Sequence, residues 1–263
     1  MRTTNVKILL RMVATFKENT CCSEKSLHLL CYSYPSFVIN TRMKSIPYEE
    51  NNQPDNKISD PSVSYTLNGL SLDPNKLYTY ADYLNWFDNI RRELINGMVR
   101  LMSGPNTIHS RITTGLVSTI WSFIKKRRAK CEIFHAPIDV RLPKGGETAN
   151  DKIFTVLQPD ICVVCDPSKI DQRGIIGAPD LVVEVQSPST AKYVMSKKFD
   201  IYEEAGVKEY WVVYPNAGLT IFLLQDSGKY DAGTNYDIVF MPDAKVPVHT
   251  IEGLEIELKV LFE

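Results

Sequence analysis

Two carboxylates stand in neighbouring apolar stretches of the chain, where an acid is costly unless a cation balances it. Asp160 precedes the apolar run 161–164, and Glu184 lies inside the apolar run 181–185. A carboxylate buried in a strand needs a charged partner or a metal ion. The two acids are therefore candidates for a site that binds a divalent cation.

Strand geometry decides which acid can join Glu184. Asp180 and Glu184 face the same side of one strand, but at roughly 3.3 Å per residue they lie about 13 Å apart, too far to share one small cation. Asp160 can approach Glu184 if their strands run side by side, connected through the loop that contains Gly174 and Gly177. We therefore expect Asp160 and Glu184 to hold the metal, and Asp180 to serve at the start of its strand.

A lysine interrupts the apolar face of the helix predicted after the second acidic strand. We expect this helix over about 191–205, with Gly206 as its stop. Lys198 shares a helical stripe with Phe199 and Tyr202. Hydrolysis of a phosphodiester uses such a set: the acids hold Mg²⁺ or Mn²⁺, the metal activates water, and the lysine offsets charge on the phosphate.

Each of these residues also has a structural explanation. Asp160 follows a proline, a common place for turn chemistry. Glu184 could pair with an arginine or lysine, and Lys198 could pack its stem in the core while its ammonium reaches water. Their closeness in the sequence favours a site, because ionisable groups cluster at functional sites.

The order and spacing of several motifs resemble the Uma family of restriction endonucleases, which belong to the PD-(D/E)XK superfamily. The motifs around the acids and the lysine are QPD (158–160), GAPDLVVEVQSPST (177–190), Lys198 with Phe199 and Tyr202, and AGVKEYWVV (205–213). The earlier motifs are YTYADYL (78–84), RELING (92–97), His109 and APIDVRL (136–142). The resemblance spans residues 77–262.

This resemblance implies a nuclease that depends on a divalent metal, with Asp160 and Glu184 as the metal-binding acids. In the wider superfamily a lysine stands two residues after the second acid. This chain has Gln186 there, a candidate catalytic residue whose neutral amide can orient water or phosphate but supplies no charge. The Uma pattern moves the lysine to the following helix, and Lys198 stands at the matching position. Many members also carry an aspartate where this chain has Val194.

Two further polar residues lie in motifs of the resemblance. Glu93 precedes the hairpin signal Asn96-Gly97; it could add a carboxylate to the metal site or pair with one of the arginines at 91, 92 and 100. His109 lies near the start of a predicted helix whose apolar residues recur at helical spacing. For His109 a structural role is favoured over a catalytic one.

The chain of 263 residues is long enough for one α/β domain after a tail is set aside. Helices before and after a largely buried sheet predict an α/β sandwich. The resemblance implies a restriction-endonuclease-like mixed sheet flanked by helices over residues 66–263. Helices are predicted at 79–89, 106–126 and 191–205, and a hairpin turn at 96–97. Strands are predicted near 131–142, 154–165, 180–186, 209–214 and 219–224, with a closing β segment near 237–257.

Residues 1–65 differ in composition from the rest. Asn, Asp, Pro, Ser and Glu concentrate in 48–64, which is typical of a disordered linker. We interpret 1–65 as an extension and linker, and Met43 as a candidate for the true start. The stretch Ile8-Leu9-Leu10 is cut by Arg11, so neither a signal-peptide core nor a membrane span is expected.

Charge and cysteine usage narrow the class of protein. A formal net charge of −1 argues against nonspecific coating of nucleic acid, and the basic cluster 125–130 either complements a helix C-terminus or contacts a DNA backbone.

Cys162 and Cys165 have CxxC spacing, but strand residues three apart face opposite sides, so we expect small strand residues rather than a zinc or redox pair. Cysteine usage favours a reducing, cytoplasmic compartment.

The sequence thus predicts a DNA endonuclease that depends on Mg²⁺ or Mn²⁺. A homodimer is plausible, because two cuts in a duplex usually require two symmetry-related sites. One alternative is a catalytically inactive nuclease-fold module that binds DNA or a protein. Another is an unrelated metal-dependent hydrolase that acts on small phosphoesters.

Overall fold

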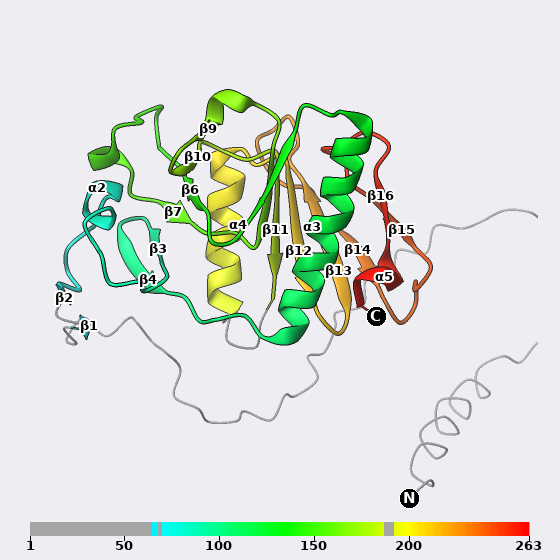
Figure 1. Cartoon of the computed structure of the whole chain (residues 1–263), viewed down its shortest axis with the longest axis horizontal. Helices are drawn as coiled ribbons and strands as arrows, with labels where there is room; N and C mark the ends of the chain where they lie inside the picture. The colour runs from blue at the N-terminus through cyan, green and yellow to red at the C-terminus, as the bar shows by residue number, and fades with distance from the viewer. Residues whose placement is uncertain (1–64, 68–69, 187–191, 263) are drawn as a thin grey trace, which may run out of the picture. The chain divides into compact units, whose positions relative to one another are not determined.

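The computed structural model describes residues 65–67, 70–186 and 192–262 (Figure 1). Most of the predicted extension, 1–64, lies outside these residues, so the domain boundary at residue 66 stays a prediction. The described part begins with a short antiparallel pair, β1 (Tyr65–Leu67) and β2 (Leu70–Leu72).

The predicted helix at 79–89 begins where expected but is short. Thr79 caps α2 (Tyr80–Tyr83) in a capping box with Asp82, whose side chain accepts the backbone N–H of Thr79. After Leu84 the chain makes tighter bonds three residues back, from the N–H of Asn85 to the carbonyl of Asp82. The helix therefore ends after about one turn.

The predicted hairpin turn is confirmed between β3 (Arg92–Ile95) and β4 (Met98–Leu101), which pair antiparallel. Asn96 has φ 50° and Gly97 has φ 82°. Positive φ at both central residues is the backbone that a two-residue hairpin requires, and Asn-Gly adopts it readily. The turn fixes the register that places Glu93 in β3.

The described residues form two six-stranded sheets and two short pairs. The first sheet has the order β4-β3-β7-β6-β10-β9, with β6 (Asp139–Arg141), β7 (Val156–Leu157), β9 (Ile170–Asp171) and β10 (Gly174–Ile176). The second has the order β14-β13-β12-β11-β8-β5, with β5 (Glu132–His135), β8 (Ile161–Val164), β11 (Leu181–Val185), β12 (Glu209–Tyr214), β13 (Gly218–Leu223) and β14 (Thr234–Asp237). Both are mixed, since β6–β10 and β11–β12 pair parallel and the other neighbours antiparallel.

The remaining elements are short. Two 3₁₀ turns cover Asn150–Lys152 and Pro167–Lys169. The predicted closing segment is divided among β14 and the antiparallel pair β15 (Lys245–Pro247) and β16 (Glu255–Glu257), which leads into α5 (Leu258–Phe262).

Two predicted strands are each divided between the two sheets. The segment 131–142 forms β5 in the second sheet and β6 in the first, with Pro137 between them, and 154–165 forms β7 and β8 with Pro159 between them. Proline has no N–H to donate to a ladder, so it interrupts a strand. The chain thus crosses between the sheets at 158–160, and Asp160 lies at this junction.

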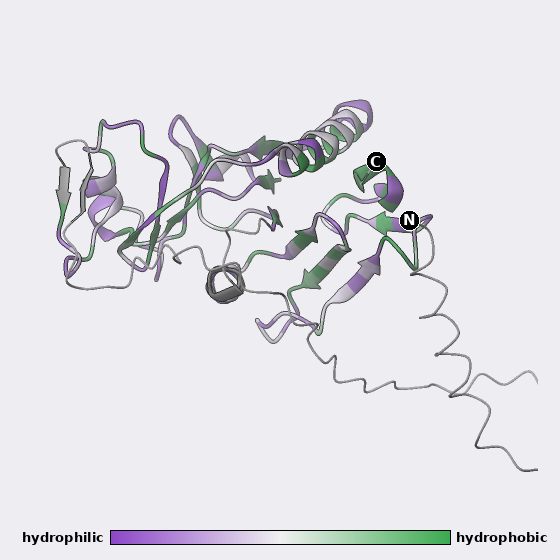
Figure 2. Cartoon of the chain, turned by 90° about the horizontal axis from the view of Figure 1, so that it is seen from below, coloured by the Kyte–Doolittle hydropathy of each residue, from purple (hydrophilic) through white to green (hydrophobic). Residues whose placement is uncertain are grey.

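Helices α3 (Thr107–Arg127) and α4 (Lys192–Ala205) cover opposite faces of the second sheet (Figure 1). Leu181 and Val183 pack with the buried residues of α3, whereas Val182 packs with Ile201 and Tyr202 of α4. Figure 2 shows hydrophobic strands between the two helices, with α4 seen nearly end-on. The predicted fold class, a mixed sheet flanked by helices, is confirmed, and the single sheet is replaced by two.

Cys162 is a small strand residue as expected, but the same expectation is wrong for Cys165, which follows β8. Cys165 forms a disulfide with Cys131, whereas Cys162 is buried and carries a free thiol. The disulfide of Cys165 also argues against the reducing compartment inferred from cysteine usage. Cys162 and Cys165 do face opposite sides of the sheet, because they belong to different core clusters. Within the described ranges, no helix has the length and apolar character needed to cross a membrane.

Candidate functional site

Asp160 and Glu184 lie on neighbouring strands. Strand β8, which Asp160 precedes, runs antiparallel to β11, which carries Glu184. Oδ2 of Asp160 accepts the backbone N–H of Val185 at 2.7 Å. The carboxylate of Asp160 is therefore fixed against the residue that follows Glu184. The strands of the two acids run side by side, as the sequence predicted.

Lys198 reaches this place from α4. Its Nζ lies 2.8 Å from Oε1 of Glu184, and the hydroxyl of Tyr202 donates to the same oxygen at 2.7 Å. Lys198 is only 3% exposed. Its ammonium is not in water. The alternative, in which the aliphatic stem of Lys198 packs in the core and its ammonium reaches solvent, is therefore wrong.

Glu93 joins the cluster from β3 of the first sheet. Its Oε1 lies 2.8 Å from Nζ of Lys198 and accepts the backbone N–H of Gln158 at 2.9 Å. The predicted alternative, an arginine partner, is wrong. Among the described residues Arg92 pairs with Asp88, and Arg91 donates to the amide oxygen of Gln158.

Gln186 continues β11 through its backbone, which donates to the carbonyl of Val213 at 2.8 Å. Its side chain is half-buried and makes no hydrogen bond within the described residues. The amide is thus free to meet a substrate or water. The side chain of Val194, which replaces the family's aspartate, lies outside the described residues.

His109 contacts one of the two candidate acids, and its role stays a prediction. Its ring Nε2 lies 3.0 Å from Oδ2 of Asp160. Asn106 caps α3 by accepting the backbone N–H of His109, so the histidine stands in the first turn, where the helix begins beside the junction. The position of His109 near the helix start and its place in the family motifs were the features of the sequence that pointed to this residue. The hydrogen bond to Asp160 raises the pKa of His109 despite its partial burial.

Burial and charge shift the pKa values of the cluster. Burial raises the pKa of Glu184 to about 7; the charges of Asp160 and Glu93 act in the same direction, and Lys198 opposes them. Burial alone would lower the pKa of Lys198, but Glu184 and Glu93 outweigh it and raise that pKa. Glu93 and Glu184 contact the ammonium of Lys198, and the charge of Asp160 also acts on Glu184. The cluster therefore holds more carboxylates than ammonium groups, which favours a cation.

The donor set fits Mg²⁺ or Mn²⁺ through two acids. Such ions prefer carboxylate oxygens, and Mg²⁺ commonly takes one or two of them and completes its shell with water and phosphate. Among the described residues, the contacts of these side chains fall on Oδ2 of Asp160 and Oε1 of Glu184, which leaves Oδ1 and Oε2 available.

The role of Glu93 as a third metal ligand stays a prediction. In the part of the chain that the structure describes, no group of three or more His, Cys, Asp or Glu side chains is arranged to hold a metal ion. The Oε1 of Glu93 is already engaged by Lys198 and by the backbone of Gln158. Like Glu184, Glu93 thus contacts Lys198 through one oxygen, Oε1.

Comparison with known proteins identifies the family of this chain. The Uma2 family model, described as "Putative restriction endonuclease", matches residues 80–258. "Uncharacterized protein slr1290" from Synechocystis sp. is 26% identical over 183 residues, which are 69% of this chain and 89% of that protein. A crystal structure of "a putative nuclease belonging to DUF820" from Anabaena variabilis has a TM-score of 0.55 at 24% identity, over 70% of this chain and 97% of that chain, and shows a shared fold. The chain belongs to the Uma2 family, whose model carries that description.

Proposed function

We propose that the protein is an endonuclease that hydrolyses phosphodiester bonds of DNA with Mg²⁺ or Mn²⁺. The observation that carries the proposal is the buried ammonium of Lys198, which is held by Glu184 and Glu93 where the two sheets meet. Asp160 lies beside this pair, because its carboxylate accepts the backbone N–H of Val185, the residue after Glu184. Membership of a family described as restriction endonucleases supports nuclease chemistry and DNA as the substrate.

Asp160 and Glu184 would hold the ion, which supplies Lewis-acid stabilisation of the phosphate and activates water. His109 donates to Oδ2 of Asp160 and so orients the other oxygen of that carboxylate. Lys198 holds Glu184 and Glu93 in place and contributes positive charge near the phosphate. The amide of Gln186 orients water or a phosphate oxygen.

A second candidate function is a nuclease-fold module that binds DNA or a protein without turnover. The engagement of Lys198 by two carboxylates favours it, because an ammonium held at 2.8 Å by both acids is less available to a phosphate. Gln186, which stands where the wider superfamily has its lysine, supplies no charge to compensate.

Cleavage of both strands of a duplex would require two copies of the site, most simply in a homodimer. Sedimentation of the full chain with and without a DNA duplex measures the number of copies in the complex. A single copy bound to a duplex that is cut on both strands would contradict the dimer.

We infer that such a nuclease acts in the cytoplasm, where its DNA substrate would be met.

The test is cleavage of supercoiled plasmid by the full chain with Mg²⁺, Mn²⁺ or EDTA. Asp160→Asn and Glu184→Gln keep the side-chain size and should abolish metal-dependent nicking. The matched control is Asp180→Asn, since Asp180 is a buried carboxylate at the start of the same strand that pairs with Lys208 instead of joining the site. Circular dichroism checks that each variant is folded.

Each result has a separate meaning. Nicking by the wild type and by Asp180→Asn, lost in the two site variants, supports the nuclease. Equal nicking by all proteins points to a contaminant or a wrong site. Binding of DNA without nicking under any metal favours the inactive module, and activity restricted to small phosphoesters favours an unrelated hydrolase.

A further inference from the structure

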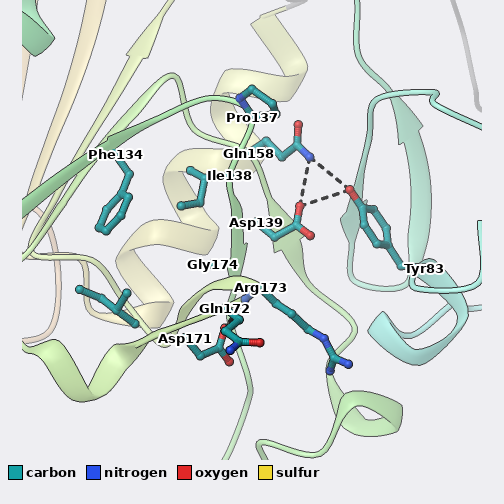
Figure 3. Close-up of a pocket in the computed structure, with 11 residues that line it drawn as sticks. Tyr83, Phe134, Pro137, Ile138, Asp139, Gln158, Asp171, Gln172, Arg173 and Gly174 are labelled. Atoms are coloured by element: carbon teal, nitrogen blue, oxygen red, sulfur yellow. Dashed lines mark hydrogen bonds between the residues drawn. The ribbon is translucent and has the colours of Figure 1, made fainter. Parts of the chain in front are cut away.

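A polar pocket of about 430 Å³ is lined in part by Gln158, which precedes Asp160 by two residues (Figure 3). Asp160 belongs to the acidic cluster, which also contains Glu93 and Glu184. The size of the pocket falls in the range of small-molecule sites, roughly 300 to 1,000 Å³. The residues that matter for its chemistry are Tyr83, Phe134, Ile138, Asp139, Gln158 and Arg173. The proposed nuclease site uses none of these six side chains, and the pocket has no assigned ligand.

Asp139 forms a fixed hydrogen-bond acceptor in the pocket. Its Oδ1 lies 3.2 Å from the hydroxyl of Tyr83 and accepts Nε2 of Gln158 at 3.0 Å, and its Oδ2 accepts the hydroxyl of Tyr80 at 3.1 Å. Arg91 in turn holds the amide oxygen of Gln158, so the orientation of that amide is set. A carboxylate has about four acceptor positions. These donors use at most three, since the single proton of the Tyr83 hydroxyl also lies within reach of the carbonyl oxygen of Arg92. One position remains for a donor on a ligand.

The rest of the pocket suits a planar group that is joined to an anion. The half-buried ring of Phe134 and the side chain of Ile138 lie on one side of Asp139, and Tyr83 lies on the other (Figure 3). Arg173 is exposed at the pocket, and its guanidinium makes no hydrogen bond or ion pair within the described residues. An apolar wall, an acceptor and a cation match a nucleobase with its phosphate.

The pocket and the acidic cluster are joined by one short extended segment. Gln158 precedes Asp160 by two residues, so their Cα atoms lie at most about 7 Å apart. Successive nucleotides of a stacked strand rise about 3.4 Å, so this span corresponds to one or two nucleotides. The backbone N–H of Gln158 also holds Glu93, the partner of Lys198. A strand with one phosphate at the acids can thus place a nearby base in the pocket.

We propose that this pocket receives one unstacked base of the DNA strand, and that the base carries an exocyclic amino group. The proposal rests on the proposed nuclease function and defines its substrate preference. The amino group of cytosine donates to the free acceptor position of Asp139, whereas uracil and thymine present the oxygen O4, which the carboxylate repels. A base reaches such a pocket from single-stranded DNA or after it leaves the helical stack.

The test compares short fluorescent oligodeoxycytidine and oligodeoxyuridine, whose pyrimidine rings differ in bearing an amino group or an oxygen at position 4. Binding to the full chain is followed by fluorescence anisotropy in EDTA, so that no cleavage is needed. We expect the wild type to bind the cytidine strand about tenfold tighter, the effect of one hydrogen bond to a charged group. Asp139→Asn should reduce that preference to near unity.

Two further variants separate the base from the phosphate. Gln172 is an exposed pocket residue whose side chain makes no hydrogen bond within the described residues, so Gln172→Trp should block the pocket without harm to folding and abolish the preference. Arg173→Ala should weaken both strands alike and reduce the salt dependence by about 0.7 in logarithmic slope. The control Lys245→Ala removes an exposed cation from β15 and should change neither quantity.

Equal affinity of the wild type for the two strands, or an unchanged preference in Gln172→Trp and folded Asp139→Asn, overturns the pocket proposal. Because binding is measured without cleavage, the result is separate from that of the plasmid assay. Metal-dependent nicking with no base preference would support the nuclease proposal and contradict the pocket proposal. A base preference that Gln172→Trp abolishes, without any nicking, would support the pocket proposal and contradict the nuclease proposal.

Discussion

The ammonium of Lys198 lies 2.8 Å from Oε1 of Glu93, and this contact ties α4 to β3 of the first sheet. Both side chains are buried, with 4% and 1% of their surface exposed. The same ammonium lies 2.8 Å from Glu184 of the second sheet. One cation therefore links a helix and both sheets at the candidate site.

Removal of that cation should destabilise the protein. In Lys198→Met two buried carboxylates lose their partner, and the free energy of unfolding should fall by about 3 to 5 kcal/mol. Urea unfolding at neutral pH in EDTA measures it. The matched control is Lys208→Met, which also breaks an ion pair but removes a side chain that is 72% exposed, and it should cost less than about 1 kcal/mol. Equal costs would show that the buried cluster is not held by Lys198.

The ionisation of Glu184 should respond to Glu93. In metal-free protein the carboxyl carbon of Glu184 should titrate with a pKa of about 7, and Glu93→Gln should lower that pKa, because one negative charge is removed and Lys198 is left to Glu184. Carbon-13 NMR of labelled glutamate follows the titration. An unchanged midpoint in Glu93→Gln would mean that Glu93 does not contribute to the raised pKa of Glu184.

This shift has a consequence for stability. The pKa of Glu184 is raised on folding from an ordinary value of 4.5, so the folded state binds more protons than the unfolded state between pH 4.5 and about 7. The contribution of Glu184 is fully present below the lower value and is lost as the pH rises through the upper one. The loss should be smaller in Glu93→Gln, and urea unfolding across this range measures it.

His109 should act through Asp160. His109→Ala removes the donor that orients the carboxylate, and the affinity for Mn²⁺ should fall about tenfold. His109→Gln retains an N–H donor and should recover part of that affinity. Isothermal titration with Mn²⁺ alone gives the affinity, and His135→Ala is the control, since His135 is an exposed histidine of β5. Equal affinities for all four proteins would leave His109 with a structural role only.

Asp180 should support stability in acid. Burial opposes its ionisation, but Lys208 and the backbone N–H of Cys165 outweigh burial and lower the pKa of Asp180 below 3.8. A lowered pKa contributes stability that is present above the unfolded value and is lost as the pH falls through the folded value. Asp180→Asn should therefore be less stable than the wild type at neutral pH, and the difference should vanish in strong acid. Urea midpoints across this range test it, and a constant difference would exclude Asp180 as the cause.

Local chemistry made several elements predictable from the sequence. The turn at Asn96-Gly97 and the start of the helix predicted at 79–89 depend on residues that are close in the chain, and both are found in the structure, where Thr79 caps α2. The two strands interrupted by proline were predicted as continuous. Their apolar pattern is the same in one sheet or two, so periodicity could not show the break.

For the site, the sequence by itself determined which residues could share a face. The rise and alternation of strands paired Asp160 with Glu184, and helical spacing turned Lys198 inward; the structure brings these three together. The sequence named Glu93 and His109 as candidates, but only the tertiary structure places Glu93 of β3 against Lys198 and His109 of α3 against Asp160. The physical reason is that periodicity fixes the direction of a side chain within its own element, whereas its neighbours from distant elements are fixed by how sheets and helices pack.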